Sequence, residues 1–556
     1  MPVMTGSRFF AETMRGYGVT HLFYVPAPMP EAMTEMERVG VTRVVAHSET
    51  AVAYMADGYA RASHRPGVCL GQAVGAGNVA AGLRDAYLAS SPVIAITGGP
   101  QPDSRYRYLY QIVEDFPMFE PVTKLNVRVE KPERLPDLLR QAFRAATSGT
   151  PAPVHLEMPG RNGEVVVRDE ADFQLIVEER FTRYPAYRPE AEPELVREAV
   201  RLLSRAERPV IVAGGGVTAS QAAAEVVRLA ELLSIPVATS PNGKEVIPGD
   251  HPLSAGVVGT YSRWCANRTV SEADLVFFIG TRAGGHTTYN WKIPREGTPV
   301  LQLDIDPEEV GRNYPAKVGL CGDAKATLQR LIEVAEPVSS RGAWIQHVQQ
   351  LVRSWRSEVE SVLASDAVPI RPERICQEIT DFLPPEAVLV VDTGHAGLWT
   401  GTMVELNRPG QRYIRCAGTL GWAFPASLGV KCALPDNPVL CFIGDGGLFY
   451  HLSELETAAR LGINAVVLVN NNRSLQQVKR LVDASYGGNP EGKGDDQWVF
   501  PETNFARIAE EMGCLGIRVE QPGELKGALE RAFAAHRPVV VDVVSDRFAL
   551  PAKPWG

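Results

Sequence analysis

Asp445, set between two glycines, and Asn472, the last of three asparagines, are residues whose types could hold a charged ligand. A carboxylate and an amide offer the oxygen ligands that a hard cation such as Mg2+ prefers, and such a cation commonly keeps phosphate oxygens in its shell. With the glycine loop beside them, these residues suit a cation held against a diphosphate. A glycine turn followed by a polar loop would use the same residue types without any ligand.

The segments around these residues predict where they lie. Apolar runs at 439–443 and 465–469 are typical of buried strands, and each ends just before the polar group. Residues 453–461 have helical spacing and stop at Gly462. A strand–helix–strand unit brings Asp445 and Asn472 to the carboxyl edge of a parallel sheet, where ligands of open α/β sheets collect.

The GDG sequence at 444–446, followed by the asparagines, resembles the signature of thiamine-diphosphate (ThDP) enzymes. Aligned without gaps to acetohydroxyacid synthase and benzoylformate decarboxylase, the family's NN falls on Asn471 and Asn472, and Asn470 is one extra asparagine. The resemblance implies that Asp445, Asn472 and the main-chain oxygen of Ser474 hold Mg2+. It also implies that Gly446 and Gly447 approach the diphosphate of the cofactor.

Size and composition are those of a large globular protein that needs no nucleic acid or membrane partner. The 556 residues are 45% hydrophobic and 22% charged, with a formal net charge of −9 and no basic stripe. We find no basic-then-apolar leader and no apolar run near 18 residues, so we expect no membrane span. The eight cysteines form no CxxC pair and are expected to be reduced thiols of a cytoplasmic protein.

Three α/β blocks follow one another along the chain, separated by stretches rich in proline and charge. We expect domains at 1–180, 190–340 and 366–556, each a doubly wound parallel sheet, because strand-like runs alternate with amphipathic helices. The blocks also look like the pyrimidine-binding, central and diphosphate-binding domains of the ThDP family. The likeness covers essentially the whole chain and includes DGYAR at 57–61 and PVTK at 121–124.

Glu49 is the candidate proton-transfer group. It opens an expected helix, with Ser48 as a plausible N-cap, and an acid in a first helical turn is also favoured by the helix dipole alone. By resemblance, Glu49 stands at the position of the family's catalytic glutamate, eight residues before DGYAR, and bonds the aminopyrimidine ring of the cofactor. Glyoxylate carboligase lacks this glutamate, so Glu49 argues against that member.

Two further segments match cofactor-binding positions of the family. In the sequence GTLGW at 418–422, Leu420 would be the apolar wedge beneath the bent cofactor, and the Gly418 carbonyl would bond the pyrimidine amino group. Outside that alignment, a leucine is ordinarily a core residue. Gly394 and His395 follow the strand-like run 388–391, where backbone N–H groups can face phosphate oxygens. His395 could contact phosphate or substrate, or it could have only a packing or surface role; both alternatives stay open.

The resemblance also indicates the substrate side of the site. Tyr110 and Gln111 line up with the Phe-Gln pair of acetohydroxyacid synthases, so Gln111 could bond the first carbonyl substrate; it could also be an ordinary loop residue. Ala27 replaces a glycine of the family near the pocket. Gln476, Gln477 and Val478 would line the acceptor side and make it more polar.

The sequence GTRAGGH at 280–286 retains Arg282 but lacks the acids of FAD-binding synthases, so FAD is not expected. The pattern is closest to acetolactate synthase large-subunit-like proteins, which implies a ThDP- and Mg2+-dependent carboligase acting on 2-oxoacids and other small carbonyl compounds. Alternatives are a non-oxidative 2-oxoacid decarboxylase, a lyase of the benzaldehyde lyase type, and a non-catalytic ThDP-binding homologue. The family's active sites lie between subunits, so a homodimer or homotetramer is expected.

Overall fold

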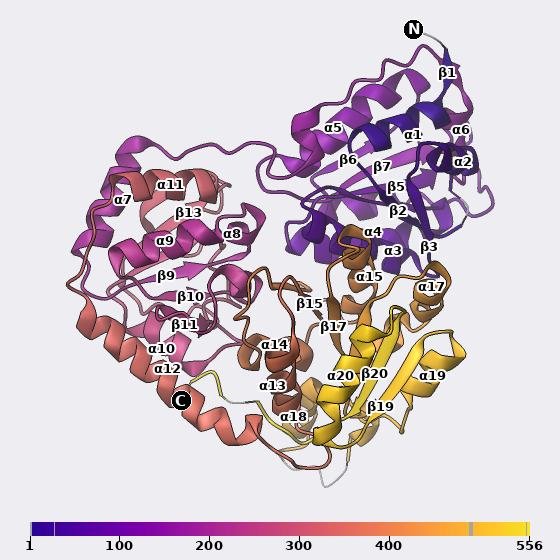
Figure 1. The fold of residues 1–556 in the computed structure, drawn as a ribbon. Helices are drawn as coiled ribbons and strands as arrows, with labels where there is room; N and C mark the ends of the chain where they lie inside the picture. The colour runs from indigo at the N-terminus through magenta and orange to yellow at the C-terminus, as the bar shows by residue number, and fades with distance from the viewer. Residues whose placement is uncertain (1–2, 27, 489–492, 552, 556) are drawn as a thin grey trace.

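The structure is a computed structural model that describes residues 3–26, 28–488, 493–551 and 553–555. Three six-stranded sheets carry the N-terminal, central and C-terminal parts of the chain (Figure 1). Every strand pair within them is parallel. Their inner strands are apolar and buried on both faces, as in sheets covered by helices on each side. The expected fold class is confirmed.

The N-terminal sheet has the order β3-β2-β4-β5-β7-β6. Its strands are β2 (His21–Tyr24), β3 (Thr42–Val45), β4 (Gly67–Gly71), β5 (Val93–Gly99), β6 (Leu125–Arg128) and β7 (Val154–Pro159). Its helices are α1 (Gly6–Gly16), α2 (Pro30–Arg38), α3 (Glu49–Ser63), α4 (Ala76–Leu88), α5 (Leu135–Thr147) and α6 (Glu164–Arg168). A short antiparallel pair, β1 (Met4–Thr5) and β8 (Glu170–Ala171), lies beside this sheet's helices.

The central sheet has the order β11-β10-β9-β12-β13-β14, so the chain reverses its direction of growth between β9 and β12. Its strands are β9 (Pro209–Ala213), β10 (Val237–Thr239), β11 (Ser254–Val257), β12 (Leu275–Ile279), β13 (Val300–Asp304) and β14 (Ala316–Cys321). Its helices are α7 (Pro193–Arg205), α8 (Gly215–Ala219), α9 (Ala223–Leu233), α10 (Trp264–Glu272) and α11 (Ala324–Val334).

The long helix α12 (Gly342–Leu363) leads from the central sheet to the C-terminal sheet, whose order is β16-β15-β17-β18-β20-β19. The strands are β15 (Val388–Val391), β16 (Arg412–Arg415), β17 (Val439–Gly444), β18 (Val466–Asn471), β19 (Leu515–Val519) and β20 (Val539–Val544). The helices are α13 (Pro372–Phe382), α14 (His395–Met403), α15 (Ala423–Ala433), α16 (Asp445–Leu448), α17 (Glu454–Leu461), α18 (Gln476–Ser485), α19 (Phe505–Glu511) and α20 (Leu525–Ala534).

Helices α3 and α15 join the N-terminal and C-terminal domains. They pack on each other, and one hydrophobic core contains residues of both domains, including Met55 and Leu428. Glycines allow the close approach: a Cβ at Gly58 would lie 2.1 Å from the Ala426 carbonyl oxygen, and one at Gly429 would lie 1.9 Å from the Met55 carbonyl oxygen. The interface is therefore formed by backbones in near contact.

Local expectations are met at the elements that matter for the site, with one correction. The strand and helix around Asp445 and Asn472 form as expected, and Gly462 ends α17 with a positive φ of 63°. Ser48 does stand at the N-cap of α3, but its side chain makes no capping hydrogen bond. Glu49 is the only acid in that first turn, so the dipole interaction remains.

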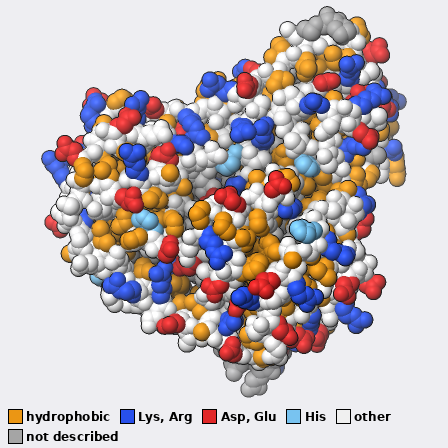
Figure 2. Space-filling view, in the orientation of Figure 1, with side chains coloured by type: hydrophobic (Ala, Val, Ile, Leu, Met, Phe, Trp, Pro, Cys, Tyr) orange, Lys and Arg blue, Asp and Glu red, His pale blue; other side chains and the backbone are white. Residues whose placement is uncertain are grey.

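The visible surface carries basic and acidic side chains in an interspersed pattern, with no continuous field of one sign (Figure 2). Within the described residues, no helix combines the length and apolar character that crossing a membrane requires. All eight cysteines are free.

Candidate functional site

A cavity of about 180 Å³ lies at the carboxyl edge of the C-terminal sheet, where β15, β17 and β18 end. This is the edge at which parallel sheets bind ligands. Most of the residues singled out from the sequence line it, and all of its lining residues belong to the C-terminal domain. Those from the sequence analysis are Gly394, His395, Leu420, Asp445, Gly446, Gly447, Asn472, Ser474, Gln476, Gln477 and Val478.

Asp445 is one of two acids, with Asp392, among the described residues that line this cavity, and it is 2% exposed. Its Oδ1 accepts a hydrogen bond from the Gly446 N–H at 2.8 Å, and its Oδ2 accepts one from the Ser474 N–H at 3.0 Å. Burial raises the pKa of this carboxyl to about 7, and the backbone donors oppose that rise. The raised pKa means that the protein alone does not fully stabilise the charged form of this carboxyl. A bound cation would favour that form.

The three asparagines point to different sides because successive residues of a strand alternate between its faces. Asn470 and Asn472 line the cavity, whereas Asn471 donates to Asp542 Oδ1 at 2.8 Å. Asn472 Oδ1 accepts from Ser474 Oγ at 2.8 Å. Asn470 Oδ1 is buried without a hydrogen-bond partner among the described residues.

These donors fit a hard cation. They are the carboxylate of Asp445 and amide oxygens, with Asp392 as a second lining acid, and no group of three or more His, Cys, Asp or Glu side chains gathers as a metal cluster in the described part of the chain. Mg2+ is commonly held by one or two carboxylates and completes its shell with phosphate and water oxygens.

The glycines beside Asp445 have a packing reason as well. A Cβ at Gly446 would lie 2.5 Å from Leu475 Cδ2, and one at Gly447 would lie 3.0 Å from Ile443 Cγ1. Gly394 has φ 67° at the start of α14, a conformation that favours glycine. Glycine is therefore favoured at these positions, in the turn before α14 and in the turn at Asp445.

Gln476 connects two sides of the cavity. Its Nε2 donates to the carbonyls of Arg547 and Ala549, at 2.8 and 2.6 Å, which leaves Oε1 as an acceptor. That oxygen lies 3.2 Å from Asn472 Nδ2 and 3.0 Å from His395 Nδ1. Gln476 is therefore held on all sides and orients Asn472.

His395 must donate from Nδ1 to this oxygen, and burial lowers the pKa of its imidazole. The neutral ring then has a lone pair on Nε2. A phosphate contact through Nε2 would require the protonated ring, which burial disfavours, so the packing alternative gains support.

Leu420 lies half-buried in the segment between β16 and α15 and faces the cavity, unlike an ordinary core leucine. Gly418 is absent from the described residues that line the cavity; its N–H donates to Asp85 of the N-terminal domain at 3.1 Å. Asp392, at the end of β15, accepts from the N–H groups of Gly421 and Ala423 at 3.1 Å each. Burial raises the pKa of Asp392 to about 7.

Other predicted residues lie in the N-terminal domain, outside this cavity. Glu49 is half-buried at the first position of α3, and its Oε2 accepts from Asn78 Nδ2 at 3.2 Å. Gln111 follows the exposed Tyr110 on a loop and has φ 63°. Ala27 lies outside the described residues.

Sequence reasoning gave no site role to Asp392 or Asn470 and did not single out Asp85. Asp392 follows an apolar run in the same way as Asp445, so that local signal could have found it. Asp85 lies within a helix of another domain, and nothing local marks it.

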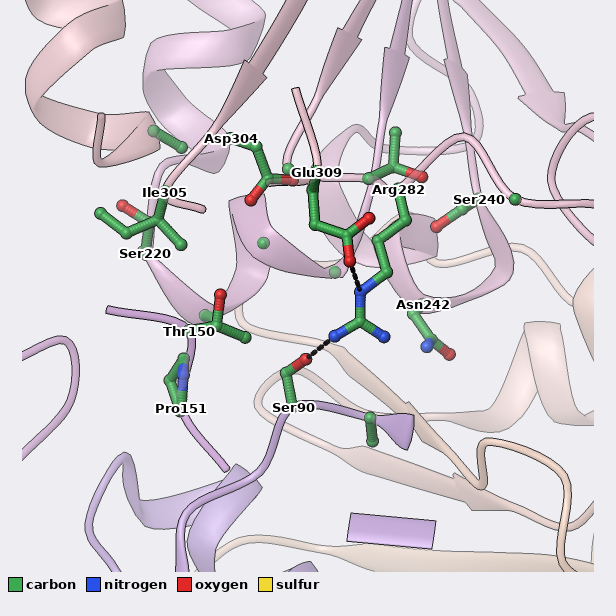
Figure 3. Close-up of a pocket in the computed structure, with 18 of the residues that line it drawn as sticks. Ser90, Thr150, Pro151, Ser220, Ser240, Asn242, Arg282, Asp304, Ile305 and Glu309 are labelled. Atoms are coloured by element: carbon green, nitrogen blue, oxygen red, sulfur yellow. Dashed lines mark hydrogen bonds and ion pairs between the residues drawn. The ribbon is translucent and has the colours of Figure 1, made fainter. Parts of the chain in front are cut away.

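A larger cavity of about 480 Å³ lies between the N-terminal and central domains, at the carboxyl ends of β9 and β12 (Figure 3). Arg282 spans it: its Nη2 donates to Ser90 Oγ at 2.9 Å, and its Nε lies 3.6 Å from Glu309 Oε1. Asp304 also lines this cavity, and burial raises the pKa of its carboxyl to about 6. The absence of FAD stays a prediction.

Comparison with known proteins shows the family. Residues 4–118 match the N-terminal TPP binding domain of thiamine pyrophosphate enzymes, 196–331 match their central domain, and 392–543 match their C-terminal TPP binding domain. The chain belongs to the thiamine pyrophosphate enzyme family, which confirms the resemblance found in the sequence, and its cofactor is ThDP.

Several relatives match over nearly the whole chain. A probable acetolactate synthase large subunit of Methanocaldococcus jannaschii is 31% identical, covering 100% of this chain and 94% of its own. A glyoxylate carboligase of Escherichia coli O157:H7 is 32% identical, covering 95% of this chain and 91% of its own. Acetolactate synthase isozyme 3 large subunit of Escherichia coli K12 is 28% identical, covering 98% and 96%.

Proposed function

We propose that this enzyme is a ThDP- and Mg2+-dependent carboligase of the acetolactate synthase type, which joins an acyl unit from a 2-oxoacid to a second carbonyl compound. The observation that carries the proposal is the cavity in which Asp445, Asn472 and Leu420 meet, in a chain similar over its whole length to acetolactate synthases. The relatives do not favour the decarboxylase or lyase alternatives.

The cation would be held by the Asp445 carboxylate, Asn472 Oδ1 and the Ser474 carbonyl oxygen. The turn at Gly446 and Gly447 lies beside them and leaves its backbone open to the diphosphate. When bound, ThDP supplies the electron sink that lets a carbonyl carbon act as a nucleophile. Leu420 would press on the cofactor from the cavity wall and keep it bent.

Glu49 would hold and release the proton on the aminopyrimidine ring. Since the lining of the cavity comes from the C-terminal domain alone, the acid has to be brought by another surface. A second copy of this chain can supply it, with Glu49 of each subunit serving its partner's cavity. We therefore propose a homodimer or a dimer of dimers, and a fully active monomer would contradict this assembly.

Gln111 would then reach the same site from the partner's N-terminal loop and bond the carbonyl of the first substrate, with Tyr110 beside it. Gln477 and Val478 would line the acceptor side, next to Gln476. Gln477 already contacts the central domain, since its Nε2 donates to the Tyr261 hydroxyl at 3.1 Å. Ala27 is retained as a proposed pocket residue.

Glu49 also bears on the choice between the named relatives. A glyoxylate carboligase and an acetolactate synthase large subunit have nearly the same identity to this chain, 32% and 31%, but the acid at position 49 favours the latter. We further propose that the domains span 1–180, 190–340 and 366–556, that the enzyme acts in the cytoplasm, and that it needs neither FAD nor nucleic acid.

Proton NMR of the purified enzyme with ThDP, Mg2+ and pyruvate tests this function. We expect acetolactate from the wild type and none from Glu49→Gln. Acetaldehyde as the only product would overturn the carboligase in favour of the decarboxylase. Absence of any turnover would show that pyruvate is the wrong donor and would overturn the acetolactate assignment.

A further inference from the structure

The segment that carries Leu420 has no regular secondary structure of its own. We call residues 416–422, between β16 and α15, the wedge loop. An irregular segment keeps one conformation only if its backbone groups find fixed partners. The wedge loop finds them in two buried carboxylates that come from different domains.

Asp85, on α4 of the N-terminal domain, holds the first half of the wedge loop. Its Oδ1 accepts from the Ala417 N–H at 2.8 Å, and its Oδ2 accepts from the N–H groups of Gly418 and Thr419 at 3.1 and 3.0 Å. The Thr419 hydroxyl donates to the same Oδ2 at 2.7 Å. One side chain, fully buried and more than 330 positions away in sequence, thus receives four donors from three successive residues.

Asp392 holds the second half, through the N–H groups of Gly421 and Ala423. Leu420 lies between the two sets of bonds, and its side chain faces the cavity. The two carboxylates therefore fix the backbone on both sides of this residue.

Helix α3 fixes the ends of the same loop. Arg61 Nη1 donates to the Arg415 carbonyl at 2.6 Å, and Asp57 Oδ2 accepts from Trp422 Nε1 at 2.9 Å. Arg61 also bonds Asp57 and lies 3.2 Å from Asp85 Oδ1, so one guanidinium is shared by both buried acids.

We propose that Asp85 is a positioning residue for the cofactor: it sets the shape of the wedge loop and so the place of Leu420 in the cavity. This inference rests on the proposed function, because it takes the cavity as the ThDP site. Asp85 acts through the loop and is not among the described residues that line the cavity.

A carboxylate is needed at position 85 because both oxygens accept from the loop. An asparagine has one acceptor oxygen, and its NH2 group would oppose N–H groups of the loop. Asp85→Asn thus preserves the shape of the side chain and removes the bonds on one side.

The first measurement is amide hydrogen exchange of the apoprotein, followed by mass spectrometry on peptides that cover residues 416–422. We expect faster exchange in Asp85→Asn at 417–419. Thr419→Val removes only the hydroxyl contact and should have a smaller effect in the same direction. This variant tests the proposal if Asp85→Asn fails to fold. Exchange equal to that of the wild type in these variants would overturn the proposal.

The second measurement is the dissociation constant of ThDP with Mg2+, from titration calorimetry without substrate. We expect it to rise roughly tenfold to a hundredfold in Asp85→Asn, as when groups that orient a site are removed. The matched control is Asp323→Asn, a buried acid of the central domain that accepts from the Ala326 N–H and from Arg188. Its ThDP affinity should equal that of the wild type.

Unchanged ThDP affinity in Asp85→Asn, with a loosened loop, would also overturn the positioning role. A wild type that binds ThDP and orders the loop but makes no acetolactate would overturn the proposed reaction and leave the role of Asp85 standing. The two failures are therefore distinguishable.

Discussion

The N-terminal and C-terminal sheets are built on one plan. Numbered by appearance in the chain, the strands of both follow the order 2-1-3-4-6-5. In both, the second strand is followed by the helix that packs against the other domain, α3 after β3 and α15 after β16. The central sheet has the different order 3-2-1-4-5-6.

The two similar sheets differ in the residues that come directly after equivalent strands. The third strand of the C-terminal sheet leads to Asp445, and that of the N-terminal sheet leads to Gln72. The fourth strands lead to Asn472 and to Pro100, respectively. Of these four residues only Asp445 is a carboxylate, so the acid that a cation would need follows a strand of one sheet and not its equivalent in the other. The loops and not the fold therefore set the chemistry.

The connections after the second strands also differ. In the N-terminal domain the connection leads straight into α3, whose first residue is Glu49, whereas the C-terminal domain inserts the wedge loop before α15. The proposed acid and the proposed wedge thus occupy equivalent places of two similar domains. Substitutions in each domain test this division of roles.

Glu49→Gln should lower carboligase activity by about 10²- to 10⁴-fold, because it removes the group that exchanges the proton. ThDP affinity and the thermal midpoint should stay near those of the wild type. Activity is measured by NMR, with Glu31→Gln as control, since Glu31 also lies in the first turn of a helix. Equal losses in both variants would contradict a catalytic role.

Asp445→Asn should weaken binding of Mg2+ and ThDP by roughly 10- to 100-fold, since it removes the carboxylate proposed to hold the cation. Titration calorimetry measures this loss, and Asp323→Asn is again the control. Wild-type affinity in Asp445→Asn would place the cation elsewhere.

Leu420→Ala and Leu468→Ala should separate activity from stability. Leu420 is half-buried, so its loss should cost about 1 kcal/mol of stability but up to about a hundredfold in activity, through a misplaced cofactor. Leu468 is fully buried in β18, so its loss should cost about 2–5 kcal/mol. Thermal unfolding measures the loss of stability, and NMR assays measure the loss of activity. The same ratio of activity loss to stability loss in the two variants would contradict the wedge role of Leu420.

The N-terminal sheet should be sensitive to acid through His155, which lies in β7. Burial lowers the pKa of this histidine to about 3 from its ordinary value of 6.5. The unfolded chain therefore binds the extra proton first, so this contribution to stability is present above pH 6.5 and is lost as the pH falls toward 3.

The loss from this one group should reach about 2 kcal/mol between pH 6.5 and pH 5. Thermal midpoints at pH 7 and pH 5 should differ less in His155→Gln than in the wild type. In the control His536→Gln, at an exposed position, this difference should equal that of the wild type. An unchanged pH dependence in His155→Gln would show that this histidine does not contribute to the loss of stability in acid.

Local sequence signals predicted a large part of the fold and of the cavity. Apolar runs and Gly462 marked the strand–helix–strand unit, and parallel pairing then brings Asp445 and Asn472 together by geometry alone. Family resemblance, not spacing, indicated Leu420 and Glu49. Asn470 was treated as an extra residue, yet it shares the cavity face with Asn472 because strand residues alternate.

The sequence by itself determined the three α/β domains, the edge at which the C-terminal sheet holds its polar residues, and the family. Only the tertiary structure decided that Gln476 bridges Asn472 and His395, that Glu49 lies apart from its own chain's cavity, and that Asp85 holds the wedge loop. Strand and helix patterns arise from interactions between near neighbours and can be seen in a short window. A carboxylate that receives backbone donors from another domain leaves no periodic trace, because its partners are brought to it only by the packing of α3 and α4 against the C-terminal domain.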